Sequence, residues 1–432
     1  MPHDRTRIPA LVALAAALVV QPGAHAQVTL PGVPKIAVPI LPALDVPATL
    51  SDLGRRVAAD ARRLRIRDLL RRHPRALDRD PAGELIVRGE ILAFSPSDSS
   101  LARLRDAGFS VLREEVLEVG ARIVALSAPG SARHALARVR KADPAGRYDY
   151  NHIYLDGGTL GAALTNSTAA PALAARSAAS LSPAPAIATH VPPRIGLIDT
   201  GVDSALPVFA HAAIEQSGCD APVPAPHGTA VASLIADAYP AATIVAADVF
   251  CRLPTGGASD RIAAALDRMA REHVAVVNAS LVGPRNLVVE GVTRLLVTRG
   301  VLIVAAVGND GPAALPLFPA AYPGVVGVTA VDAGNKVLPE ACRGDQVDFA
   351  ARGADLEAVG GAGGRVPVRG TSFAAPLVTA RLAALLHEPD PAAAAAAVTS
   401  LAHEATDLGR KGRDIIYGDG YVAPLVDLAG RK

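Results

Sequence analysis

The chain has 432 residues, of which 50% are hydrophobic and 19% are charged, so it is too apolar for a disordered protein and long enough for at least two domains. Lys and Arg total 43 and Asp and Glu total 41, which leaves a formal net charge of +2. This balance gives no reason to expect nucleic acid or an acidic polymer as a partner, so partners have to be inferred from individual sites.

Residues 1–26 have the pattern of a signal peptide. Arg5 and Arg7 precede an apolar run over 8–20, and the small-residue pattern Ala-His-Ala follows at 24–26. The alternative is a membrane anchor, but the apolar run is too short to span a bilayer. We therefore expect cleavage after residue 26, no integral membrane anchor, and a protein secreted to the extracellular space or the periplasm.

Residues 27–83 are predicted to form an N-terminal extension that contains one basic amphipathic helix. Ser51 to Arg72 has apolar residues at helical spacing and eight arginines between Arg55 and Arg72. Such a helix can contact an anionic membrane or an acidic partner, or it can pack on a neighbouring segment and leave its basic side in solvent. We favour the second interpretation.

A small α/β unit is predicted over 84–156. Its expected strands and helices alternate in the order β-α-β-β-α-β of a ferredoxin-like unit, namely 85–94, 99–107, 109–119, 122–126, 131–141 and 148–154. Residues 157–193 are then rich in Gly, Ala, Ser, Thr and Pro with almost no charge. This composition predicts an exposed linker, where proteases preferentially cut.

From residue 194 to 432 the pattern changes to continuous apolar strands that alternate with helices. This is typical of a doubly wound, mostly parallel sheet that is covered on both faces. The expected strands are 195–198, 213–215, 244–249, 274–278, 301–307 and 325–331. The expected helices are 228–236, 259–272, 287–299 and 372–386.

Three cysteines, Cys219, Cys251 and Cys342, matter in an oxidising compartment. Cys219 and Cys251 each follow a predicted strand, and neighbouring parallel strands would bring both thiols to the same end of the sheet. We expect a Cys219–Cys251 disulfide and a leftover thiol at Cys342, although connectivity is not determined by sequence alone.

Three short motifs carry residues suited to nucleophilic catalysis. Asp199 ends a buried strand in Asp-Thr-Gly, His227 opens an apolar helix in His-Gly-Thr, and Ser372 begins another helix in Gly-Thr-Ser-Phe-Ala-Ala-Pro. Each has a simpler explanation, as a turn-forming Asp, a core or capping His and a helix N-cap. Together they supply a nucleophile, a base and a carboxylate that orients the base, in the chain order Asp, His, Ser.

These motifs resemble the three signature blocks of the subtilisin family of serine peptidases, over 194 to the chain end. The resemblance implies a monomeric serine endopeptidase that hydrolyses polypeptides through an Asp199–His227–Ser372 triad and an acyl-enzyme intermediate. Gly308 and Asn309, in Val-Gly-Asn-Asp-Gly, resemble the family's oxyanion donor segment, although an Asn can also serve only to form a turn.

The resemblance also implies a substrate cleft. Residues 280–283, Ser-Leu-Val-Gly, resemble one wall of the primary specificity pocket, with Ser280, Leu281, Val282 and Gly283 as its residues. Gly256, within 253–257, resembles the edge that pairs with an extended peptide. Since the family usually has Gly at the position of Val282, this side chain either narrows the pocket toward small or medium apolar residues or points outward.

The 84–156 unit resembles a propeptide that aids folding, inhibits the active site and is removed by self-cleavage between about Tyr154 and Val191. After His227 no inserted loop supplies calcium ligands, so we expect no required metal or cofactor, and a weak structural calcium site elsewhere stays open. Two other classes are a catalytically silent binding protein and an esterase or acyltransferase with the same triad. Neither explains a complete triad together with a long peptide cleft as well as an endopeptidase does.

Overall fold

A computed structural model describes residues 62–128, 130, 132–160, 192–219, 221, 223–251, 253–361 and 363–425. The predicted signal peptide, most of the N-terminal extension and most of the predicted linker lie outside the described residues.

The larger part of the described chain is built on a sheet of seven parallel strands in the order β15-β14-β13-β11-β7-β9-β8. Apart from the edge strand β8, its strands are almost entirely buried, which is why they are continuous apolar runs in the sequence. The fold prediction is therefore confirmed. In chain order the strands are β7 (Arg194–Asp199), β8 (Ala213–Ser217), β9 (Thr243–Asp248), β11 (Val276–Ala279), β13 (Leu302–Ala306), β14 (Val325–Val331) and β15 (Phe349–Arg352).

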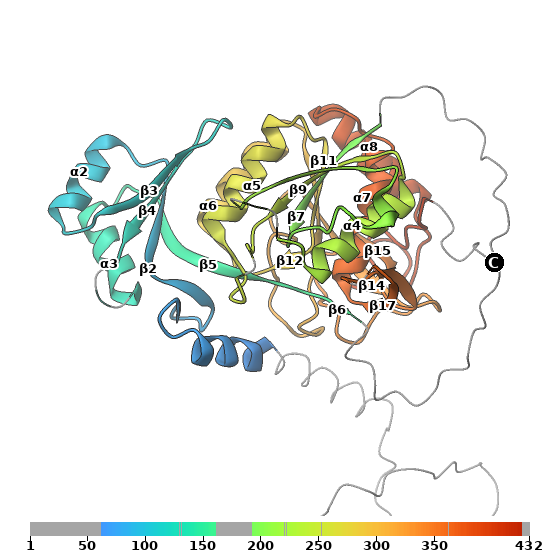
Figure 1. Ribbon diagram of the computed structural model, residues 1–432, viewed down its shortest axis with the longest axis horizontal. Helices are drawn as coiled ribbons and strands as arrows, with labels where there is room; N and C mark the ends of the chain where they lie inside the picture. The colour runs from blue at the N-terminus through green and yellow to red at the C-terminus, as the bar shows by residue number, and fades with distance from the viewer. Residues whose placement is uncertain are drawn as a thin grey trace, which may run out of the picture. The chain divides into compact units, whose positions relative to one another are not determined.

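Helices cover both faces of this sheet (Figure 1). α4 (Pro226–Ala238) and α7 (Thr371–Ala383) pack in one hydrophobic cluster, and α5 (Ser259–Arg271) and α6 (Leu287–Thr298) pack in another. Neighbouring residues of β7 alternate between them, since Leu197 belongs to the first cluster and Ile198 to the second. The sequence did not predict η2 (Pro207–Phe209) or α8 (Pro391–Glu404).

The smaller unit has the predicted β-α-β-β-α-β order, with antiparallel strands arranged β5-β2-β4-β3. An extra strand, β1, pairs with the first three residues of β2, Leu85 to Val87. The elements are β1 (Leu77–Arg79), β2 (Leu85–Phe94), α2 (Asp98–Asp106), β3 (Val111–Val116), β4 (Arg122–Ser127), α3 (Ala132–Ala142) and β5 (Tyr148–Asp156).

The predicted boundary at residue 83 differs from the structure. A helix over 62–72 buries Ile66 and Leu69 against Leu77 of β1 and Leu85 of β2. These two residues stand three apart and so lie on one side of the helix. The helix and β1 therefore belong to the small unit, and the helix packs on a neighbouring segment, as the sequence favoured.

The chain after β5 also differs from the predicted linker. β5 pairs antiparallel with β10 (Gly257–Ala258) and β12 (Leu281–Val282), two short strands of the larger part. Two residues after the start of the predicted linker, β6 (Thr159–Leu160) pairs with β17 (Arg365–Arg369), which also pairs with β16 (Leu356–Val359). Residues up to 160 are thus a strand docked on the larger part rather than linker.

Candidate active site

Asp199, His227 and Ser372 are brought together at the carboxyl end of the parallel sheet. Asp199 is the last residue of β7, His227 lies in the first turn of α4, and Ser372 is the second residue of α7. Pro226 begins α4, where its missing N–H has no helical partner to lose. All three side chains are buried, with exposures of 1%, 4% and 0% in that order.

The carboxylate of Asp199 holds the ring of His227. His227 Nδ1 lies 2.8 Å from Asp199 Oδ1, and the backbone N–H of Thr200 donates to the same oxygen at 2.7 Å. Burial disfavours the charged ring, but the charge and hydrogen bond of Asp199 outweigh burial and raise the pKa of His227 above its usual value. His227 Nε2 makes no hydrogen bond to a described residue, so this nitrogen is free to receive a proton.

Ser372 is held by contacts of its own hydroxyl and of the residue that follows it. The phenyl ring of Phe373, the next residue, has its centroid 5.5 Å from that of His227. Ser372 Oγ donates to the carbonyl of Ser280 at 3.3 Å, and Ser280 Oγ donates to the carbonyl of Ser372 at 2.8 Å. Ser280, predicted to line the pocket, thus ties the start of α7 to the end of β11.

Asn309 follows β13 and faces the start of α7. Its Oδ1 accepts the backbone N–H of Thr371 at 3.1 Å, which fixes the amide, while Nδ2 is buried and makes no hydrogen bond to a described residue. Gly308 donates its N–H to Thr371 Oγ1 at 3.2 Å. Gly308 has φ +102°, and a Cβ there would lie 2.6 Å from Leu317 Cδ1, so only glycine suits this position.

The chain itself runs through the cleft in front of Ser372. In the pairing of β5 with β12, Asp156 faces Leu281 and Leu155 faces Val282. On the opposite edge the pairing strand begins at Gly257, one residue after the predicted Gly256. A Cβ on Gly256 would overlap the carbonyl oxygen of Tyr154, so this glycine permits the close approach.

Val282 points inward, which decides between the two orientations that the sequence left open. Its Cγ2 lies 3.9 Å from the position of a Cβ on Gly157, and that Cβ position is 3.1 Å from Ser372 Oγ. Gly283 continues this wall by bridging to Phe318. Val282 therefore lies within van der Waals contact of a side chain placed at Gly157.

Two arginines of the 62–72 helix reach the cleft, and sequence reasoning missed both. Arg65 forms an ion pair with Asp156 and donates from Nη1 to the carbonyl of Asp156 at 3.0 Å. Arg62 contacts Glu84 at 2.8 Å and Asp310, the neighbour of Asn309, at 3.3 Å. Nothing in the arginine-rich pattern distinguished these two from their solvated neighbours.

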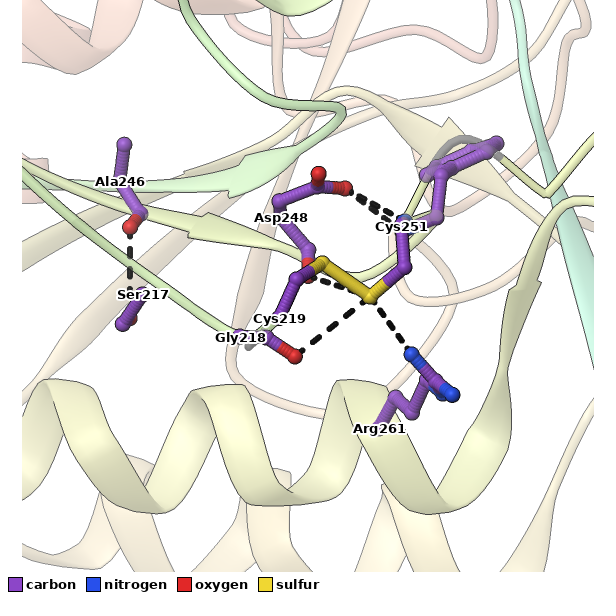
Figure 2. The surroundings of a disulfide bond; sticks show 8 residues. Ser217, Gly218, Cys219, Ala246, Asp248, Cys251 and Arg261 are labelled. Atoms are coloured by element: carbon purple, nitrogen blue, oxygen red, sulfur yellow. Dashed lines mark hydrogen bonds between the residues drawn. A yellow bond between two sulfur atoms is a disulfide. The ribbon is translucent and has the colours of Figure 1, made fainter. Parts of the chain in front are cut away.

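The structure joins the predicted pair Cys219 and Cys251 in a disulfide beside the end of β9 (Figure 2). Asp248 Oδ1 accepts the backbone N–H of Cys251 at 2.8 Å, and the guanidinium of Arg261 contacts the Cys251 sulfur. Within the described ranges, Asp248 and the two sulfurs are the group spaced to suit a metal ion, but bonded sulfurs offer no thiolate ligand. Cys342 is buried, and burial raises the pKa of its thiol to about 12.

The profile of the Subtilase family matches residues 193–420, more than half of the chain. The chain therefore belongs to the subtilase family of serine peptidases, as its motifs indicated.

Individual relatives match over shorter stretches. Minor extracellular protease Epr of Bacillus subtilis (strain 168) is 36% identical over 125 residues, which make up 29% of this chain and 19% of that protein. M-protease of Shouchella clausii (strain KSM-K16) is 30% identical over 207 residues, 45% of this chain and 53% of that protein. The chain thus spans about a fifth to about half of these two curated relatives.

A solved structure shares the fold. Fervidolysin from Fervidobacterium pennivorans, described as a keratinolytic enzyme related to subtilisin, superposes with a TM-score of 0.63 at 21% identity, covering 79% of this chain and 60% of that one. This share exceeds the family match, so the likeness extends into the small N-terminal unit. Among the described residues no helix is long and apolar enough to cross a membrane.

Proposed function

We propose that this chain is the self-processing precursor of a secreted serine endopeptidase, with Asp199, His227 and Ser372 as its catalytic triad. The observation that carries the proposal is the chain segment in the cleft, which is strand-paired on both edges as a peptide substrate would be and has Gly157 at the Ser372 hydroxyl. The extracellular relative and the apolar N-terminus support secretion.

The proposed chemistry uses only protein groups. His227 Nε2 accepts the proton of Ser372 Oγ as the oxygen attacks a peptide carbonyl, and Asp199 stabilises the resulting imidazolium. Asn309 Nδ2, which is buried without a partner among the described residues, and the backbone N–H of Ser372 would donate to the oxyanion. No metal or cofactor is required, since nucleophile, base and oxyanion donors all come from this chain.

Residues up to Asp156 would act as propeptide. Tyr154 and Leu155 fill the cleft as part of β5, so an external peptide cannot pair with β10 and β12 while β5 is in place. The precursor is then inactive on other proteins until the small unit leaves.

The test compares the precursor with its Ser372→Ala variant for chain length and casein hydrolysis. The wild type is expected to shorten and to hydrolyse casein, whereas the variant stays uncut and inert. Shortening of both chains alike would assign the cut to another protease. An intact wild type that never hydrolyses casein, even after the small unit is removed, would refute the peptidase proposal.

A further inference from the structure

The residues that stand in front of Ser372 are two glycines. β5 pairs with β12 as far as Asp156, and β6 pairs with β17 from Thr159 onward. Gly157 and Gly158 are the residues between these two pairings. The chain is thus held on both sides of one Gly–Gly bond.

The contacts identify which carbonyl is presented to the nucleophile. The carbonyl of Asp156 is taken by Arg65 at 3.0 Å. A Cβ on Gly157 would lie 3.1 Å from Ser372 Oγ and 3.3 Å from Asn309 Nδ2. The carbonyl oxygen of Gly157 lies 3.3 Å from the position of a Cβ on Gly370, the residue that precedes α7. Gly157 therefore lies beside both the Ser372 hydroxyl and the Asn309 amide, with its carbonyl oxygen toward Gly370 at the start of α7.

We propose that the precursor cuts itself between Gly157 and Gly158, and that the enzyme selects glycine on both sides of the bond it hydrolyses. This inference rests on the proposed function and adds the bond and the substrate class.

The reaction needs no reactant other than water. Ser372 Oγ bonds to the Gly157 carbonyl carbon and gives its proton to His227, and the C–N bond to Gly158 breaks as His227 returns the proton to the leaving amine. Water then attacks the ester, His227 takes its proton and passes it to Ser372 Oγ, and a carboxylic acid remains on Gly157. The enzyme is regenerated with Gly158 as a new N-terminus.

Phe373 enforces glycine after the cut. A Cβ on Gly158 would overlap Cε2 of Phe373 and lie 3.0 Å from its Cζ. The Phe373 ring is fully buried and lies next to the His227 ring, so it cannot move aside without disturbing the base. Even a methyl group at this position is expected to slow the reaction.

Ser372 and Val282 line the space that a side chain before the cut would enter. A methyl on Gly157 would already lie tightly against Ser372 Oγ, and any longer side chain would extend from a point 3.9 Å from Val282 Cγ2. Val282 is itself 3% exposed and packs in the cluster around α5 and α6, so it has little room to yield. Val282 is thus a specificity-determining residue.

The first experiment measures the N-terminus and rate of processing by mass spectrometry. The wild type is expected to begin at Gly158. Overpacking a rigid site costs about 1–3 kcal/mol, so Gly158→Ala should be processed about tenfold more slowly or worse, and Gly157→Leu more slowly still. Gly364→Ala is the matched control, because Gly364 is exposed and a Cβ there meets no atom within 4 Å.

A second variant separates exclusion by Val282 from misfolding. Val282→Gly combined with Gly157→Leu should recover at least part of the processing rate that Gly157→Leu alone loses. Mature enzyme is also offered two peptides, Tyr-Leu-Asp-Gly-Gly-Thr and Tyr-Leu-Asp-Gly-Ala-Thr, and should cut the first at least tenfold faster.

The outcomes distinguish this inference from the proposed function. If the wild type is cut elsewhere while Ser372→Ala stays intact, self-processing stands and the assigned bond is wrong. If Gly158→Ala is processed at the wild-type rate, or if both peptides are cut alike, selection of glycine is wrong. Failure of Val282→Gly to recover any processing would remove the assigned role of Val282.

Discussion

Tyr154 is the side chain that anchors the chain segment in the cleft. It is completely buried, its hydroxyl donates to the carbonyl of Pro284 at 2.9 Å, and it lies 3.2 Å from the hydroxyl of Tyr322. A Cβ on Gly283 would lie 2.6 Å from its ring, so the ring rests directly on the wall of the cleft. Burial raises the pKa of Tyr154 well above its usual value, which keeps the hydroxyl a neutral donor.

Tyr154→Phe, made in the uncut Ser372→Ala precursor, removes the hydroxyl and leaves the ring. Losing one partner of a buried hydrogen bond costs about 1–2 kcal/mol. For a protein of this size that corresponds to a fall of about 1–3 °C in the thermal midpoint. Tyr154→Ala also removes the ring, and large-to-small changes of an aromatic residue cost about 3–5 kcal/mol, so its midpoint should fall further.

The assay is thermal unfolding of the purified precursor followed by circular dichroism. Tyr239→Phe is the matched control, since Tyr239 is only partly buried and its hydroxyl makes no hydrogen bond to a described residue; its midpoint should match the parent. A Tyr154→Phe precursor that melts together with the Tyr239→Phe control would refute the anchoring role.

Three further predictions concern other contacts. Burial opposes the charged form of His227, but the neighbouring carboxylates raise its pKa, so the neutral base is lost and processing slows as the pH falls through that raised pKa. Asp156→Asn removes one of these carboxylates and should move the inflection of the pH–rate profile to lower pH. An unmoved inflection would contradict this prediction. Opening the Cys219–Cys251 disulfide, with a sequence separation of 32, should cost about 3–4 kcal/mol and lower the thermal midpoint in reductant; equal midpoints would exclude a stabilising role. Arg62→Ala should lower the stability of the Ser372→Ala precursor by about 1–3 kcal/mol, after allowance for the partly exposed carboxylates of Glu84 and Asp310. The measurement is the thermal midpoint of that precursor. An unchanged midpoint would show that the two ion pairs of Arg62 are dispensable.

The central sheet could be predicted because its strands are covered on both faces. A strand such as β13 consists only of apolar residues, and its burial leaves a signal in the sequence that does not depend on its neighbours. Asp199 and Ser372 could be identified for a similar reason, since Asp199 ends a buried strand and Ser372 begins an apolar helix.

The residues that complete the cleft could not be found in this way. β6, β10 and β12 are two residues long, too short for any periodic pattern, and exist only because they pair with distant segments. Gly157 and Gly158 begin a stretch with the composition of a linker, so their place in front of Ser372 is a property of the pairing on either side. Arg65 became visible only through its contact with Asp156.

The segment in the cleft is continuous with the protein that would cut it. Since substrate and nucleophile are held in one molecule, their encounter needs no diffusion, and the effective concentration of the bond at Ser372 is fixed by the fold. Diluting the precursor should then leave the half-time of the first cut unchanged. Activity toward other proteins should depend on concentration, because it begins only after the small unit has dissociated, and dilution favours dissociation. The segment from β5 to β6 thus makes two events depend differently on concentration: the first cut, and the dissociation that frees the active site.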